Sequence, residues 1–317
     1  MYDLVALGEA LIDFTYHSKS KDGNILFEQN PGGAPANVVV MAAVLGLSVA
    51  FIGKVGADMH GDFLQDVLRT KGVDIKGIVS SADVFTTLAF VSLEGAERKF
   101  SFARKPGADT TISVAELDMD IVNSTKIFHF GSLSLTDEPA RTATIHAVKS
   151  ARTAGTLISY DPNYRPALWR SQDDAVLRMR SAIGLADIIK ISDEEMELIT
   201  GHASPENAAK VLLEQGVQCV VITFGASGAF AATARGMVRI PAATCNAVDT
   251  TGAGDVFLGS FLHQVIKSGK SLNDHTTQDL EGYLKFAAAA AALCCEKRGA
   301  IPAMPNITAI RERMGTN

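Results

Sequence analysis

The sequence predicts an α/β fold, because short apolar segments alternate with segments of helical periodicity. The predicted buried strands are 4–7, 49–53, 127–131, 157–160, 188–191 and 219–224. The predicted helices are a segment that ends near 45, then 61–71, 139–154, 256–266 and 283–296. A chain of 317 residues is long enough to bury one large core, with or without a small accessory part.

Composition and charge exclude several classes of partner. The net charge is −6 and no run of Lys or Arg is present, which argues against nucleic-acid binding. The hydrophobic fraction of 47% is ordinary for a soluble enzyme. The longest uncharged run, 31–53, is interrupted by Gly and Pro, so no membrane partner is expected. Asp3 stands where a signal peptide would carry basic residues. Four cysteines without metal-ligand spacing predict reduced thiols and a cytoplasmic protein.

At the N-terminal end, the strand 4–7 is expected to continue through Ala10–Asp13. This would place Asp13 near the carboxyl edge of the sheet, where open α/β sheets bind ligands, although a single Asp at a strand end is most often a turn residue. The polar segment 15–30 predicts irregular strands that project from the main sheet. Segments 86–93 and 99–103 flank a turn at Glu94-Gly95 and predict a hairpin.

Gly32 and Gly33 precede a helix that includes Asn37. Two glycines allow a backbone to approach a small molecule closely, and the Asn37 amide both donates and accepts hydrogen bonds. A Gly-Gly pair alone is weak evidence, since many turns contain one.

The segment Asp249–Asp255, Asp-Thr-Thr-Gly-Ala-Gly-Asp, precedes a predicted helix that has a wide apolar stripe. Phe257, Phe261 and Val265 recur at helical spacing, so Asp255 falls in the first helical turn. Amides there have no intrahelical partner and can bind phosphate oxygens. A simple N-cap would also explain Asp255, but not two acids, two threonines and two glycines within seven residues.

This segment and Gly-Gly-Ala-Pro-Ala-Asn at 32–37 resemble the two signatures of the PfkB (ribokinase-like) family of sugar kinases. The motif at 32–37 is most similar to that of the fructokinase group. The resemblance extends from Gly8 to Gly299 and implies a ribokinase-like three-layer α/β/α sandwich with a small β-sheet lid. It implies a main domain of residues 1–14, 31–85 and 104–317 and a lid of residues 15–30 and 86–103. No Walker-type P-loop motif is present.

The resemblance also implies a role for each matching residue. Asp255 would be the general base, and the amides of Gly252, Ala253 and Gly254 would stabilise the transferred phosphoryl group. The implied sugar contacts are Asp13, Gly32, Gly33, Asn37, Arg104, Asn163, Arg165 and Asp255. The implied nucleotide contacts are Lys190, Thr223, Gly225, Gly228, Gly252, Gly254 and Ala288. Glu195 would hold Mg²⁺ through water, and Asp249 and Gly299 are candidate ligands of a monovalent cation such as K⁺.

The implied activity is ATP-dependent phosphorylation of a sugar hydroxymethyl group, with D-fructose converted to fructose 6-phosphate. Fructokinases often carry Tyr where Ala103 stands, so a 2-keto-3-deoxygluconate kinase is an alternative in which Arg104 or Arg165 pairs with the substrate carboxylate. A PfkB-like sugar- or nucleotide-binding module without catalysis is a second alternative. The lid is the candidate surface for a homodimer, although Phe100 and Phe102 could equally pack inside it.

Overall fold

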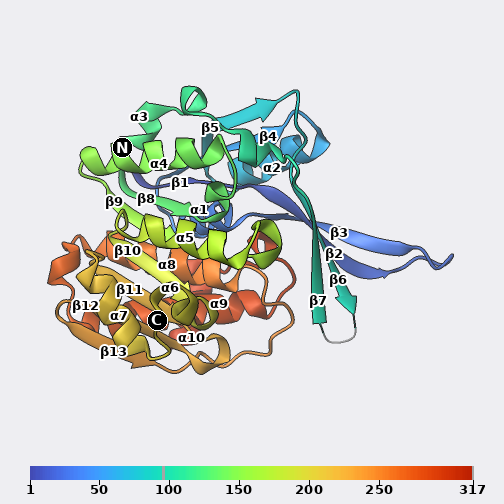
Figure 1. The fold of residues 1–317 in the computed structure, drawn as a ribbon. Helices are drawn as coiled ribbons and strands as arrows, with labels where there is room; N and C mark the ends of the chain where they lie inside the picture. Colours follow the sequence, from blue (N-terminus) through green and yellow to red (C-terminus); the bar gives the residue numbers. More distant parts are fainter. Residues whose placement is uncertain (95–96, 316–317) are drawn as a thin grey trace.

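The computed structural model describes residues 1–94 and 97–315, which form two β-sheets and two layers of helices (Figure 1). The larger sheet has nine strands in the order β13-β12-β11-β10-β9-β8-β1-β4-β5. The smaller sheet has four, in the order β3-β2-β6-β7. Gly95, part of the turn predicted at 94–95, lies outside the described residues.

All neighbouring strands of the large sheet from β5 to β11 are parallel. At the other end of the sheet, β12 pairs antiparallel with β11, and β13 pairs antiparallel with β12. Its strands are β1 (Tyr2–Leu7), β4 (Val49–Gly56), β5 (Asp74–Ser81), β8 (Thr125–Gly131), β9 (Leu157–Asp161), β10 (Ile188–Ser192), β11 (Cys219–Thr223), β12 (Ala229–Thr233) and β13 (Gly236–Ile240). All six predicted buried strands are among them. Since the carboxyl ends of parallel strands meet at one edge, the loops after β9, β10 and β11 are brought together there.

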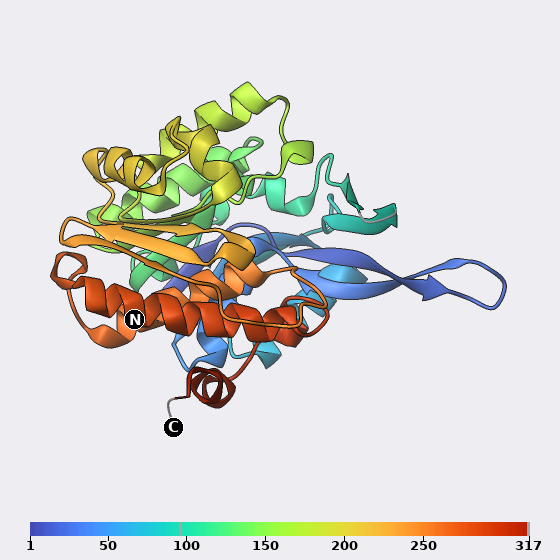
Figure 2. The same ribbon diagram turned by 90° about the horizontal axis from the view of Figure 1, so that it is seen from below.

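Helices cover both faces of this sheet (Figures 1 and 2). One layer contains α3 (Met119–Val122), α4 (Ala140–Thr153), α5 (Gln172–Ile183), α6 (Asp193–Thr200) and α7 (Pro205–Glu214). The other contains α1 (Ala34–Val44), α2 (Met59–Thr70), α8 (Ala253–Ser268) and α9 (Thr277–Cys295), with α10 (Ile307–Met314) against α9. Along β1, Val5 and Leu7 enter one core and Leu4 and Ala6 the other, because strand side chains alternate between faces. The three-layer α/β/α prediction is confirmed.

The small sheet projects from one side of the three layers (Figures 1 and 2). It consists of β2 (Leu11–Lys19), β3 (Ile25–Gly32), β6 (Leu88–Glu94) and β7 (Glu97–Ala103), so the predicted hairpin is confirmed. On one of its faces the ring of Phe90 stacks on Phe14 and meets Phe27 edge-on. The chain therefore crosses between the main body and the small sheet four times: after β1, before α1, before β6 and after β7. These four connections are called the crossing segments.

The prediction that Ala10–Asp13 extends the first strand was wrong. β1 already has β4 on one side and β8 on the other, and after a turn at 8–10 the chain enters the small sheet, where β2 pairs with β3 and β6. Asp13 thus belongs to the small sheet. That sheet also includes residues 11–14 and 31–32, which were assigned to the main domain. Its separation from the main body as a lid domain stays a prediction.

Helix boundaries follow local capping. α8 extends from Ala253 to Ser268 and ends at Gly269 in the left-handed conformation, close to the predicted 256–266. α9 begins at Thr277, six residues before the predicted start at Tyr283, because Thr276 and Asp279 form a capping box. Among residues 1–94 and 97–315, no helix combines the length and the hydrophobicity that a membrane crossing requires.

Candidate active site

A cavity of about 210 Å³ opens where β9 and β10 end and α8 begins. Its lining residues are Asn163, Tyr164, Arg165, Lys190, Ser192, Glu194, Glu195, Thr250, Gly252, Gly254 and Asp255. Seven of these were predicted site residues: Asn163, Arg165, Lys190, Glu195, Gly252, Gly254 and Asp255. The fold therefore brings the turn after β9, the start of α6 and the start of α8 to one place.

The start of α8 depends on the backbone conformation of Gly252. This residue is the N-cap, with φ of 74°, and its lack of a side chain leaves the helix without a side-chain cap. A methyl group placed on Gly252 would lie 2.3 Å from the Cβ of Ala300, so both strain and space require glycine here. Of the amides predicted to bind phosphate, that of Ala253 donates to the Thr250 carbonyl at 3.2 Å. First-turn amides such as Gly254 have no intrahelical partner.

Asp255 lies in the first turn of α8 and is 8% exposed. Its Oδ2 accepts a hydrogen bond of 2.8 Å from Nδ2 of Asn37, the predicted sugar contact on α1. Burial raises the pKa of Asp255 to about 6, although the Asn37 hydrogen bond and the charges of Lys190 and Arg165 oppose that shift. A carboxylate with such a pKa is ionised at neutral pH and is a stronger base than an exposed aspartate.

Close packing of α1 on α8 allows the contact between Asn37 and Asp255. Gly259 lies one turn after Asp255, and a methyl group there would come within 2.7 Å of the Val38 carbonyl oxygen. The absence of a side chain at Gly259 therefore sets the distance between the two helices. Among the described residues, Oδ1 of Asn37 is buried without a hydrogen-bond partner. A sugar hydroxyl could donate to this atom, so the residues present fit a polyol substrate.

Lys190 forms a buried ion pair with Asp161, with 3.0 Å between Nζ and Oδ2. Burial opposes the charge of Lys190, but Asp161 and Glu195 outweigh it and raise the pKa of the ammonium group. Lys190 is thus a fixed cation beside α8. Asp161 was missing from the predicted site, because Asp-Pro-Asn also fits an ordinary turn. Its position as the last residue of β9 was the signal that could have identified it.

Glu195 has a clear structural role. It forms a capping box with Ser192, and its other oxygen accepts a hydrogen bond of 2.6 Å from the backbone N–H of Tyr164. Glu195 therefore fastens the turn that carries Asn163 and Arg165 to the start of α6. Both its oxygens accept backbone hydrogen bonds, and Mg²⁺ binding through water stays a prediction.

On the sugar side of the predicted site, the charges of Asp255 and Arg165 act on the carboxyl group of Asp13. Burial raises the pKa of Asp13 to about 7; the charge of Arg165 opposes the shift and that of Asp255 adds to it. Gly32 packs directly on this carboxyl group, since a methyl group on Gly32 would lie 2.2 Å from Asp13 Oδ2. Gly33 follows as the N-cap of α1.

Other predicted residues lie outside this cavity. Arg104 is buried, and its guanidinium contacts Asp109, the Thr136 hydroxyl and the Leu133 carbonyl, so a sugar contact would be additional to these and stays a prediction. Thr223, Gly225 and Gly228 lie at the end of β11 and the turn after it, and Ala288 lies on α9. Their contacts with a nucleotide remain predictions.

Asp249 connects the loop before α8 to the segment before Ile301. Its Oδ2 accepts a hydrogen bond of 3.0 Å from the Gly299 amide, and its Oδ1 accepts one from the Thr251 amide. Cation binding by Asp249 and Gly299 stays a prediction. Within the described part of the chain, no group of three or more His, Cys, Asp or Glu side chains could hold a metal ion. Kinases commonly hold Mg²⁺ through one or two carboxylates together with the substrate phosphates.

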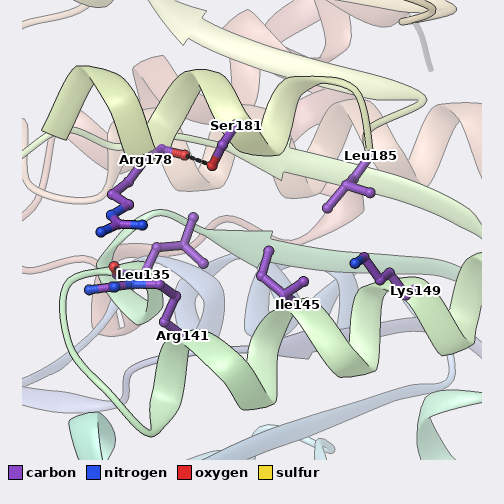
Figure 3. A pocket seen from close by; sticks show the side chains of 7 residues that line it. All are labelled: Leu135, Arg141, Ile145, Lys149, Arg178, Ser181 and Leu185. Carbon is purple, nitrogen blue, oxygen red and sulfur yellow. Dashed lines mark hydrogen bonds between the residues drawn. The ribbon is translucent and has the colours of Figure 1, made fainter. Parts of the chain in front are cut away.

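A second cavity, of about 390 Å³, lies between α4 and α5 (Figure 3). Leu135, Ile145 and Leu185 form its apolar part, and Arg141, Lys149 and Arg178 surround them with positive charge. None of the predicted site residues lines it. The cavity beside α8 is therefore the one that joins the predicted groups.

An uncapped helix start, a buried lysine and a buried carboxylate with a raised pKa together define a phosphotransferase site that acts on a hydroxyl group. Comparison with known proteins agrees: the chain belongs to the pfkB family of carbohydrate kinases, whose family model matches residues 1–307. The sequence is 41% identical over 315 residues to fructokinase-2 of Oryza sativa subsp. japonica, and the alignment covers 98% of this chain and 93% of that protein.

Solved structures give the same result. A fructokinase from Xylella fastidiosa with bound ATP superposes with a TM-score of 0.92, at 33% identity and 99% coverage of both chains. A double mutant of the fructokinase from Vibrio cholerae O395, with fructose, ADP and potassium ion bound, superposes with a TM-score of 0.87, at 30% identity and 98% coverage of both chains.

Proposed function

We propose that the protein transfers the γ-phosphoryl group of ATP to the hydroxymethyl group of D-fructose and forms fructose 6-phosphate. The observation that carries this proposal is the position of Asp255, which is buried at the start of α8, bonded to Asn37 and close to the Lys190–Asp161 pair. The similarity to fructokinases over nearly the whole chain supports fructose as the acceptor.

In this mechanism Asp255 takes the proton from the sugar hydroxyl as the hydroxyl oxygen attacks the γ-phosphorus. Asn37 orients Asp255 through its Nδ2 and can accept a hydrogen bond from the sugar through Oδ1. The amides at the start of α8 stabilise charge on the phosphoryl oxygens, and Lys190 supplies a fixed positive charge beside them. Mg²⁺ on the phosphates would neutralise part of the remaining charge.

We also propose that a monovalent cation such as K⁺ binds near Asp249 and Gly299, where it would act on the loop that holds Gly252. The hydrogen bond between Asp249 and the Gly299 amide supports this location. Turnover in K⁺, Na⁺ and Li⁺ buffers of equal ionic strength tests it. A clear preference for K⁺ that Asp249→Asn abolishes is expected, and equal rates in all three would contradict the proposal.

A 2-keto-3-deoxygluconate kinase is the second candidate. The carboxylate of such a substrate needs a cationic partner, and Arg165 is the better of the two candidates, because it is exposed at the cavity while Arg104 is buried among its own partners. Ala103 leaves space where fructokinases often have a tyrosine. Fructose stays the first candidate, because the similarity to fructokinases extends over nearly the whole chain.

Coupled ADP release with Mg-ATP, measured in parallel with D-fructose, 2-keto-3-deoxygluconate, D-ribose and adenosine, tests the assignment. Turnover that depends on fructose is expected. Turnover with the keto-deoxy acid alone would assign the carboxylate to Arg165. Absence of turnover with every acceptor, together with retained ATP binding, would support a binding module without catalysis.

The homodimer through the small sheet and the cytoplasmic location stay proposals. Ile25, Leu26 and Phe27 of β3 are exposed, which supports a contact surface on this sheet, while the side chain of Phe100 lies outside the described residues. The cysteines Cys219, Cys245, Cys294 and Cys295 are all free, as expected in a reducing compartment. Light scattering of the purified protein would measure the oligomeric state.

A further inference from the structure

Glu9 is a buried carboxyl group that the proposed mechanism does not use. It lies in the turn between β1 and β2, where the chain first leaves the main sheet for the small one, and it is 2% exposed. Its Oε1 accepts a hydrogen bond of 2.9 Å from the backbone N–H of Ala34. Its Oε2 is buried and has no hydrogen-bond partner within the described part of the chain. Buried carboxyl groups are rare, so this position requires an explanation.

The start of α1 explains the contact. Its N-cap is Gly33, which makes no side-chain cap, and Pro35 has no N–H, so the helix cannot cap itself in the usual way. Glu9 supplies the missing acceptor from a residue 25 positions away along the chain. A carboxyl oxygen at this end of a helix is also favoured by the helix dipole.

The two crossing segments are in close contact at this point. Gly33 has φ of 107°, and a methyl group on it would lie 2.3 Å from the Glu9 carbonyl oxygen. This close backbone contact fixes the position of the Gly32-Gly33 turn relative to the turn at Glu9. One helical turn further along α1, Asn37 donates to Asp255 at 2.8 Å. A displacement of the start of α1 would move Asn37 relative to Asp255.

The last crossing segment carries charges that act on Glu9. Arg104 follows β7 and pairs with Asp109 in a buried contact of 2.7 Å. Burial raises the pKa of Glu9 to about 7, the charge of Arg104 opposes this shift, and that of Asp109 adds to it. Glu9 is thus placed among three of the segments that connect the small sheet to the body.

We propose that Glu9 is a positioning residue, which caps α1 from the first crossing segment and thereby sets Asn37 and the Gly32-Gly33 turn against the sugar and Asp255. Glu9 acts on the sugar side of the site, because its side-chain hydrogen bond goes to the start of α1, which carries Asn37. The kinetic part of this inference rests on the proposed function.

The kinetic test compares Glu9→Ala, which removes the acceptor, with Glu9→Gln, which keeps an oxygen for the Ala34 amide. Glu9→Ala is expected to raise the KM for fructose about tenfold or more and to lower kcat several-fold, while the Kd for ADP measured by titration calorimetry stays within twofold of wild type. Glu9→Gln is expected to stay within about threefold of wild type in every constant. Should Glu9→Ala not fold, Glu9→Asp, which is one methylene too short to reach Ala34, carries the same expectation.

Glu116→Ala is the matched control. Like Glu9, Glu116 accepts a hydrogen bond from a backbone amide at a helix start, that of Ser113, and it also contacts the Ser113 hydroxyl and Lys54. It lies on the small 3₁₀ turn Val114–Glu116, outside the active-site cavity. Its removal is expected to lower Tm and leave the KM for fructose within twofold. A wild-type KM in Glu9→Ala, or Glu9→Gln as impaired as Glu9→Ala, would overturn the proposal.

Hydrogen–deuterium exchange separates this inference from the kinase assignment, because it needs no substrate. In Glu9→Ala the amides of Gly33, Ala34, Ala36 and Asn37 are expected to exchange at least fivefold faster than in wild type, and in Glu9→Gln at close to the wild-type rate. If exchange changes as expected but the wild-type protein phosphorylates no sugar, the role of Glu9 as a cap is supported and the proposed function is refuted. Unchanged exchange in Glu9→Ala would refute the cap whatever the activity.

Discussion

The starts of α6 and α8 lie beside the same cavity and look similar in sequence, since each has an acidic residue in its first turn. Their chemistry differs. α6 is capped by Ser192 and by Glu195, which together satisfy each other's backbone amides. α8 has Gly252 as its N-cap and no side-chain cap at all. The first helix start therefore satisfies its own amides, and the second leaves amides for a ligand.

The acids differ in the same way. Glu195 holds the neighbouring turn through Tyr164, whereas Asp255 contacts the side chain of Asn37 on another helix. An acid in the first turn of a helix thus serves structure when both of its oxygens accept hydrogen bonds from backbone amides. It is available for chemistry when glycine replaces the cap and burial raises its pKa. The predictions below test this difference, from the largest effect to the smallest.

Asp255→Asn is expected to lower kcat by about 10³-fold, because general-base catalysis typically contributes 10²–10⁴-fold. Asn keeps the shape of the side chain, so folding and ADP binding should persist. Steady-state kinetics and calorimetry measure both. Asp193→Asn, which changes an exposed acid in the first turn of α6, is the control and should stay within twofold of wild type. Near-normal turnover by Asp255→Asn would contradict its role as the base.

Gly252→Ala is expected to lower kcat by about 10²-fold, the usual loss when one oxyanion donor is misplaced. The substitution strains a residue with φ of 74° and places a methyl group 2.3 Å from Ala300, so the start of α8 must shift. Gly201→Ala is the matched control. Gly201 ends α6 with φ of 77° and has open space around it, so Ala should cost about 1 kcal/mol of unfolding free energy and leave kcat unchanged. Equal losses of kcat in both variants would contradict a specific role for the Gly252 loop.

The pH dependence should show the raised pKa of Asp255. Because the base must be ionised, kcat/KM is expected to fall about tenfold per pH unit below about pH 6. A pH–rate profile in a constant ionic-strength buffer measures this limb. A profile that stays flat down to pH 4.5 would exclude Asp255 as the titrating base.

The free energy of unfolding should change with pH in the direction opposite to that of kcat/KM. The folded state binds the Asp255 proton more tightly than the unfolded state, so the free energy of unfolding falls as pH rises from about 4 to about 6 and then levels off. Asp255→Asn lacks this term, and its stability relative to wild type should therefore increase over the same window, by on the order of 1–3 kcal/mol. Urea denaturation at several pH values measures the difference. A constant difference between pH 4 and 7 would contradict the shift.

Ser192→Ala is expected to have the smallest effect. Loss of a Ser N-cap typically costs about 1 kcal/mol, and the variant should reduce kcat only a few-fold through the turn that Glu195 holds. Thermal denaturation and kinetics measure both quantities. A loss of kcat as large as that of Gly252→Ala would mean that the two helix starts contribute equally to catalysis.

Much of this protein follows from the sequence alone. Short apolar runs located the strands of the parallel sheet, and Gly269 located the end of α8, whose observed start at Ala253 lies three residues before the predicted start at 256. The resemblance of two motifs to one family supplied the class of enzyme, and seven of the predicted residues line one cavity. The strands, the helix ends and the two motifs are local features: each depends on residues within one element or one loop, so the order of residue types is sufficient to predict them.

The tertiary structure decided the rest, because it depends on contacts between distant segments. Asn37 and Asp255 are 218 positions apart, and Glu9 and Ala34 are 25 apart, so no local pattern predicts either hydrogen bond. The chain turns at 8–10, and Leu11 begins a strand in the other sheet because its pairing partners, β3 and β6, are distant segments of the chain. Lys190 and Asp161 form an ion pair because they lie on adjacent parallel strands, β10 and β9. The residue types come from the sequence, and their partners come from the fold.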